Sequence, residues 1–197
     1  MKIKQKIISL IFIFSIAVIA GCENNESVLE ITSKSNNTVI QKEVDGIKFK
    51  FCLLNESGNS STVFKEGENI IFSFSFENDL QDSIIVSTDF IRSNFYRVYQ
   101  SDNIDVGKPW TGILCEFSMA KEELGLAPSS FKQLNCPWVL TINSQPNYPL
   151  CMSQSQSYLR AGDYYTFIDL EFHYRINKKP KSIENLKFLV NFIITKS

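Results

Sequence analysis

The chain has 197 residues, of which 16 are Phe and only 8 are Gly, a composition that favours a packed β core over a flexible or fibrous chain. Its formal net charge is −1. Three lysines lie within the first 21 residues, so the remainder carries 17 basic residues against 21 acidic ones, a net charge of −4. Because nucleic-acid binding normally needs a concentrated basic surface, no nucleic-acid partner is expected.

The N-terminus has the layout of an export signal. Three lysines within residues 2–6 precede an apolar run over residues 7–19, which is the pattern of a secretory signal. The run ends in Ile-Ala-Gly-Cys at residues 19–22, which resembles the lipobox of bacterial lipoproteins. The resemblance implies that residues 1–21 are a signal peptide and that Cys22 is lipidated, giving a membrane partner through the lipid anchor. The alternative is an uncleaved transmembrane anchor.

Residues 22–43 are rich in Ser, Asn, Lys and Glu and are predicted to form a flexible tether. The acidic residues Glu23 and Glu26, just behind Cys22, resemble surface-export signals of Bacteroidales lipoproteins. This resemblance implies an outer-membrane lipoprotein of the cell envelope, facing the periplasm or the cell surface. The folded domain is predicted over residues 44–197.

The fold is predicted from alternation with a period of two residues. The clearest stretch is 70–76, where Ile70, Phe72, Phe74 and Phe76 point to one side. Three phenylalanines on one face need a thick apolar partner layer, which a second sheet would supply. Further strands are predicted over residues 47–53, 62–64, 84–86, 95–99, 113–117, 131–140, 164–175 and 186–194. Together they predict an all-β, antiparallel β-sandwich.

Three local signals modify this pattern. Residues 118–124, followed by Gly125, carry a Ser cap, helix formers and a Gly stop, and predict one short helix in an inserted loop. Pro137 places the strand over 131–140 at a sheet edge or a bulge. Residues 143–157 form a long polar loop. Tyr164, after a Gly-Asp turn, is expected to form a tyrosine corner.

Several of these segments carry a resemblance to known families. Residues 49–76 and 95–99, the loop 107–110, the pair 137–138 and the turn 161–165 are similar to uncharacterised Bacteroidales lipoproteins with an immunoglobulin-like domain. The resemblance covers most of residues 45–175 and implies an immunoglobulin-like β-sandwich. The first hairpin also resembles the intracellular proteinase inhibitor family of bacilli, in framework strands only, so no inhibitory residue carries over.

Four cysteines remain once Cys22 is assigned to lipid. An even number in an exported chain suggests disulfides, and four cysteines allow three connectivities. Cys136 and Cys151 flank a Pro-rich loop, so a Cys136–Cys151 disulfide is predicted, with Cys52 then paired to Cys115. The alternative is buried thiols in apolar strands.

No catalytic residue, metal site or cofactor is predicted. The single histidine, His173, shares a strand face with Asp169 and Glu171, an arrangement that fits either a metal or acid–base site or simply a solvated face. Zinc sites usually need several His or Cys ligands at short spacing, so the solvated face is preferred. The sequence also lacks a nucleophile motif and a Gly-rich phosphate loop. The chain is therefore predicted not to be an enzyme.

The candidate ligand-binding residues are four aromatics in predicted loops, because exposed aromatic rings stack on sugars or anchor a protein partner. They are Trp110, Trp138, Tyr148 and Tyr158. The alternative is that they plug the ends of the core. The sequence thus predicts a non-catalytic, lipid-anchored envelope protein that binds a glycan or a surface protein, or serves in assembly. A proteinase inhibitor and a hydrolase with an unrecognised carboxylate site remain as alternatives.

Overall fold

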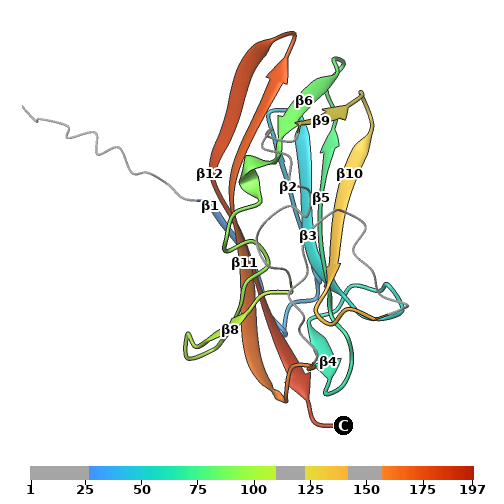
Figure 1. Ribbon diagram of the computed structural model, residues 1–197, viewed down its shortest axis with the longest axis vertical. Helices are drawn as coiled ribbons and strands as arrows, with labels where there is room; N and C mark the ends of the chain where they lie inside the picture. Colours follow the sequence, from blue (N-terminus) through green and yellow to red (C-terminus); the bar gives the residue numbers. More distant parts are fainter. Residues whose placement is uncertain (1–26, 110–122, 142–156) are drawn as a thin grey trace, which may run out of the picture.

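The computed structural model describes residues 27–109, 123–141 and 157–197, and within these ranges the protein is all-β. The strands form two sheets, arranged as two layers (Figure 1). This confirms the predicted fold class at the level of an all-β protein with two sheets. Across the described ranges, no helix has the length and apolar character needed to cross a membrane.

The larger sheet is built around the antiparallel hairpin of β11 (Gly162–Ile176) and β12 (Lys179–Thr195). The outer edge of β12 pairs in parallel with β1 (Ser27–Ile31) and β4 (Val63–Lys65). The other edge of β11 pairs with β6 and β7. In turn, β6 pairs with β9, and β7 pairs with β8. Their bounds are Ile84–Ser87 for β6, Val98–Gln100 for β7, Asp105–Gly107 for β8 and Glu123–Leu126 for β9. This layer is called the eight-stranded sheet below.

The four-stranded sheet is antiparallel throughout. Its order is β10 (Phe131–Pro137), β5 (Ile71–Asn78), β3 (Ile47–Leu54) and β2 (Val39–Val44). Pro137 is the last residue of β10, which lies at the edge of this sheet. The predicted edge position of the proline-containing strand is therefore confirmed, as expected for a residue without a ladder donor.

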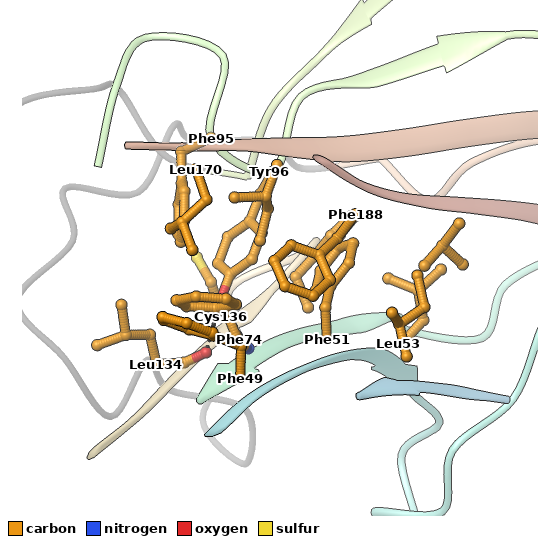
Figure 2. Packing of buried hydrophobic residues seen from close by; sticks show 14 of the residues in the cluster. Phe49, Phe51, Leu53, Phe74, Phe95, Tyr96, Leu134, Cys136, Leu170 and Phe188 are labelled. Atoms are coloured by element: carbon orange, nitrogen blue, oxygen red, sulfur yellow. Dashed lines mark hydrogen bonds between the residues drawn. The ribbon is translucent and has the colours of Figure 1, made fainter. Parts of the chain in front are cut away.

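The core lies between the two sheets and is aromatic. Alternation buries Phe49 of β3 and Phe74 of β5 completely, and both face Phe188 of β12, whose ring centroid lies 6.3 and 6.0 Å away. Figure 2 shows Phe188 and Leu170 of the eight-stranded sheet facing Phe51 and Phe74 of the other sheet. The predicted partner layer for the phenylalanines of residues 70–76 is thus the second sheet.

The side chain of Tyr96 connects the segment before β7 to the four-stranded sheet. It lies between the 3-10 helix η1 (Thr88–Phe90) and β7, has a positive φ of 61°, and is fully buried. Its hydroxyl accepts a hydrogen bond from the Phe74 backbone N–H at 3.0 Å and donates to the Leu134 backbone oxygen at 2.7 Å. Because Phe74 and Leu134 are register partners, the hydroxyl bridges β5 and β10 from inside the core.

The strand predicted over residues 95–99 is wrong before Val98, because β7 begins only at that residue.

The predicted tyrosine at the start of β11 makes the expected local contact. The Tyr164 hydroxyl donates to the Arg160 backbone oxygen at 2.9 Å, and its ring packs on Phe192 of β12 with centroids 5.5 Å apart. A tyrosine corner makes a hydrogen bond of this kind, from the hydroxyl back to the chain a few residues upstream. The contact fixes the turn that leads into the β11–β12 hairpin, which has the longest strands in the described part of the chain.

The folded part begins earlier than predicted. The tether expected over 22–43 contains β1, which pairs with β12 from Ser27↔Leu186 onward, and most of β2, which pairs with β3. The tether prediction is therefore wrong from Ser27 onward. Polar side chains are compatible with strands here because both are edge strands with one solvated side.

The helix predicted over 118–124 is wrong for its last two residues. Glu123 and Leu124 belong to β9, where Leu124 pairs with Val86 of β6 and Leu126 is buried. Pairing with a neighbouring strand outweighs a weak local helix propensity. Residues 118–122 lie outside the described residues, as do the predicted strand 113–117 and most of the predicted loop 143–157.

No disulfide joins the cysteines that the structure describes. Cys52 is a free thiol on β3, facing Ser73 of β5, and Cys136 is a thiol buried in the core. The disulfide prediction is therefore wrong for Cys52, and burial in apolar strands explains both residues. The predicted partners Cys115 and Cys151 lie outside the described residues.

We expect both thiols to stay unreactive in the native protein. Burial raises the pKa of the Cys136 thiol from 9.0 to about 12, and burial also raises the pKa of Cys52. The thiolate is the reactive form, so iodoacetamide at pH 8 should label these residues only after urea unfolding, as read by mass spectrometry. Failure of Cys136 to react in urea without reductant would contradict the thiol assignment.

The raised pKa of the Cys136 thiol makes the stability of the protein depend on pH. The unfolded Cys136 thiol loses its proton near pH 9, whereas the folded one keeps it to about pH 12. Its contribution to stability is therefore complete below about pH 9 and is lost progressively as the pH rises toward 12. A Cys136→Ser control should flatten this alkaline loss in urea titrations.

Candidate functional site

The described loop aromatics lie in different environments. Trp138 is 5% exposed; its indole N–H donates to the Ser157 backbone oxygen at 3.2 Å, and its ring packs on Phe72 at 6.2 Å. This environment fits the alternative that Trp138 plugs the core. Tyr158 is 39% exposed and could reach a ligand. Trp110 and Tyr148 lie outside the described residues, as does Cys22.

His173, Asp169 and Glu171 do lie on the outer face of β11, but the carboxylates are engaged with cations. The Glu171 carboxylate accepts two hydrogen bonds from the Arg92 guanidinium, forming a bidentate ion pair. Asp169 lies 3.4 Å from the Lys187 ammonium and accepts a hydrogen bond from Asn94. In the described ranges no group of three or more His, Cys, Asp or Glu side chains could hold a metal ion.

A groove of about 350 Å³ lies on the outer face of the four-stranded sheet. It is lined by Lys48 and Lys50 of β3, Ser75 and Glu77 of β5, and Phe131 and Gln133 of β10. A second hollow of about 210 Å³ shares both lysines and continues over β2 to Gln41 and Glu43. We call this combined surface the sheet groove.

Strand register explains why these side chains meet. Gln41, Lys50, Ser75 and Gln133 form one row across four neighbouring strands. With strands about 4.8 Å apart, the row is roughly 14 Å long. The next row ends in Phe131, which is 64% exposed. The sheet groove therefore joins a line of hydrogen-bonding groups to an open aromatic ring.

The charges of the groove are nearly balanced. Lys48 pairs with Asp79 at 2.9 Å, and this hydrogen bond raises the pKa of the Lys48 ammonium. Lys50 has no ion-pair partner in the described part of the chain and faces neutral Gln41 and Ser75 across the strands. Gln133 is held in place because its amide donates to the Ser73 hydroxyl at 2.9 Å.

These groups suit a polyhydroxylated ligand. Amide, hydroxyl, ammonium and carboxylate side chains supply both donors and acceptors at short spacing, and an exposed ring can pack on the apolar face of a sugar. Such convergent polar groups beside an aromatic ring are typical of small-ligand sites. The groove can bind and orient a ligand without any reacting group of its own.

The opposite surface of the protein is different in character. On the outer face of the eight-stranded sheet, Tyr99, Tyr165 and Phe167 form a stacked row, with centroids 5.1 Å apart for Tyr99–Tyr165 and 5.8 Å for Tyr99–Phe167. Leu189 and Ile193 of β12 share this side of the sheet, because their neighbours Phe188, Val190 and Phe192 point into the core. We call this surface the aromatic face.

Neither surface was predicted as a site. The alternation of β3 and β10 already shows that Lys48, Lys50, Phe131 and Gln133 point away from the core, so a usable signal was present. What the sequence did not supply is the register that brings the three strands together. Phe131 resembles any other strand phenylalanine until its 64% exposure is known.

Comparison with known proteins gives no assignment: no family model matches the chain, and a search of curated proteins finds no match. Any assignment of function therefore depends on the two outer surfaces and on the N-terminal sequence.

Proposed function

We propose that this protein is a non-catalytic, lipid-anchored protein of the cell envelope that binds a carbohydrate in the sheet groove. The anchor is Cys22, and the outer membrane, with the domain facing the periplasm or the cell surface, is its expected location. The proposal of a carbohydrate ligand rests on one row of polar side chains beside the exposed ring of Phe131. The row consists of Gln41, Lys50, Ser75 and Gln133.

The scaffold we propose is immunoglobulin-like. One sheet has the order β3-β5-β10 and the other the order β6-β11-β12, which corresponds to strands A-B-E and C-F-G of that fold. The hydrogen bond from the Tyr164 hydroxyl to Arg160 supports the same assignment. Such a scaffold holds the groove residues on rigid strands, which favours binding because little conformational entropy is lost.

The test uses the full lipidated chain in lipid nanodiscs, screened on an array of neutral and acidic oligosaccharides. Phe131→Ala is expected to weaken binding about tenfold, equivalent to about 1.4 kcal/mol. Gln133→Ala should weaken it similarly, because it removes a fixed donor. The matched control is Tyr158→Ala, which removes another exposed aromatic ring (39% exposed) far from the groove row in sequence and should bind as the unmodified protein does.

Three results would contradict the proposal. Loss of binding in Tyr158→Ala, with Phe131→Ala unaffected, would place recognition on the loop instead. A protein that retains no oligosaccharide, but lowers the rate of a protease in proportion to its concentration, would support the inhibitor alternative. Turnover of any glycan or ester on a substrate panel would support the hydrolase alternative.

A further inference from the structure

We propose that the aromatic face of the eight-stranded sheet lies against the membrane that holds the anchor. This inference rests on the lipid anchor of the proposed function and goes beyond it, because it assigns a second binding surface and fixes how the domain is oriented. The occupant is the headgroup region of the bilayer.

The chemistry of the aromatic face suits a membrane interface. Tyr99, Tyr165, Phe167, Leu189 and Ile193 are only partly buried, where an antiparallel sheet usually presents polar side chains to water. The three rings stack on one another, whereas Asn191 lies between Leu189 and Ile193 on the same side of the sheet, opposite Tyr165. A cluster of apolar rings on an outer sheet face marks an interaction site. Tyr165 also keeps a polar end, since its hydroxyl donates to the Asn103 side chain at 2.7 Å. Rings with one apolar and one polar end are favoured at membrane interfaces.

The chain between the anchor and the fold is short. Only four residues separate Cys22 from Ser27, the first residue of β1. Fully extended, this segment spans roughly 17 Å. The domain therefore cannot move far from the bilayer, and a short tether keeps the effective concentration of a nearby surface near the millimolar range. Even weak contacts then suffice to hold one orientation.

The tether also enters the fold beside the aromatic face. β1 lies next to β12, with Val28 opposite Lys187 and Glu30 opposite Leu189, and Leu189 in turn lies opposite Phe167. Val28 is 48% exposed. The tether therefore joins the domain at the border of the aromatic face. Of the two outer surfaces, the aromatic face is thus the one nearer to the anchor.

Two of the carboxylates around the aromatic face are paired with cations. Asp105 pairs with Arg97, and Asp169 pairs with Lys187. The Lys187 ammonium also lies 4.6 Å from the centre of the Phe167 ring. Because these two carboxylates are neutralised within the protein, they repel anionic headgroups less than unpaired ones would. Glu30, opposite Leu189, and Asp163, opposite Ile193, share this side of the sheet without an ion pair among the described residues, and Glu30 accepts a hydrogen bond from Asn191. The sheet groove, on the outer side of the other layer, then faces away from the membrane toward solvent.

The test compares two lipidated full-length chains in vesicles of phosphatidylethanolamine and phosphatidylglycerol. One is unmodified; the other has a long Gly-Ser spacer inserted between Glu26 and Ser27. A charged, water-soluble diazonium reagent modifies exposed tyrosines, and mass spectrometry follows each one. In the unmodified chain, Tyr99 and Tyr165 should react about tenfold more slowly than in the spacer variant, as expected for a tenfold excess of the docked state. Tyr158 is the internal control and should react equally in both.

Equal rates at Tyr165 in the two chains, on protein whose Cys22 carries acyl groups by mass, would overturn this inference alone. Absence of acyl groups from Cys22 would overturn the anchor and the inference together. Protection that persists in the spacer variant and grows with protein density would overturn the inference in favour of a second copy of the chain on this face.

Discussion

Replacing Phe74 with alanine is expected to lower the free energy of unfolding by about 4 kcal/mol, because a large buried ring is removed without a replacement. Phe74 is fully buried at the centre of the core. Its ring lies within 6.2 Å of Phe49 and Phe188, one from each sheet, and of Phe95 in the turn before β7. The resulting cavity would therefore be lined from both layers, and neither layer can close over it alone.

Urea unfolding followed by circular dichroism measures this effect. The matched control is Phe131→Ala in β10, since Phe131 is 64% exposed on the opposite side of the same sheet. It should change the free energy of unfolding by no more than about 0.5 kcal/mol. A similar loss in both variants would mean that phenylalanine content rather than burial sets the stability of this core.

Replacing Tyr96 with phenylalanine is expected to cost about 3 kcal/mol although the ring is retained. The hydroxyl satisfies the Phe74 N–H and the Leu134 carbonyl, at 3.0 and 2.7 Å, inside a fully buried site. Removing it leaves two buried backbone groups without their partner, and each such loss costs about 1–3 kcal/mol. The same burial raises the pKa of the Tyr96 hydroxyl well above its ordinary value, so it stays protonated and able to donate.

Tyr165→Phe is the control for this substitution, because it removes a hydroxyl whose bond to Asn103 is exposed to solvent. Its cost should stay below about 0.5 kcal/mol. Hydrogen exchange gives a second measurement: in Tyr96→Phe the Phe74 amide should exchange faster, whereas amides of the β11–β12 hairpin should keep their protection. Uniform acceleration across both sheets would indicate global destabilisation without a local opening between β5 and β10.

The strands with strong alternation were predictable, and their pairing was not. Phe72, Phe74 and Phe76 define β5 from sequence because large apolar side chains at every second position are typical of a half-buried strand and of no helix. β1 lacks this signal: its stability comes from a parallel partner about 160 positions away, which local pattern cannot reveal. For the same reason β9 was mistaken for the end of a helix.

The candidate site shows a related limit. The sequence pointed to loops, where binding residues are common, whereas the sheet groove is built on the outer faces of neighbouring strands. Lys50, Ser75 and Gln133 are ordinary solvent-facing strand residues until their register places them in one row. Conversely, Trp138 could not be separated from an exposed aromatic by sequence, because burial depends on the tertiary contacts that cover it.

The position of β1 also affects how the anchored domain would respond to force. β1 is an edge strand of five residues, and a pull on the lipid anchor reaches it before any other element. If it peeled from β12, β2 would become the first paired strand, and the linker after Cys22 would grow from four residues to the sixteen of 23–38. Its reach would then increase from roughly 17 to roughly 56 Å. A domain holding a heavy glycan could thus extend under tension and recover by re-pairing one short strand, while its aromatic core remained folded.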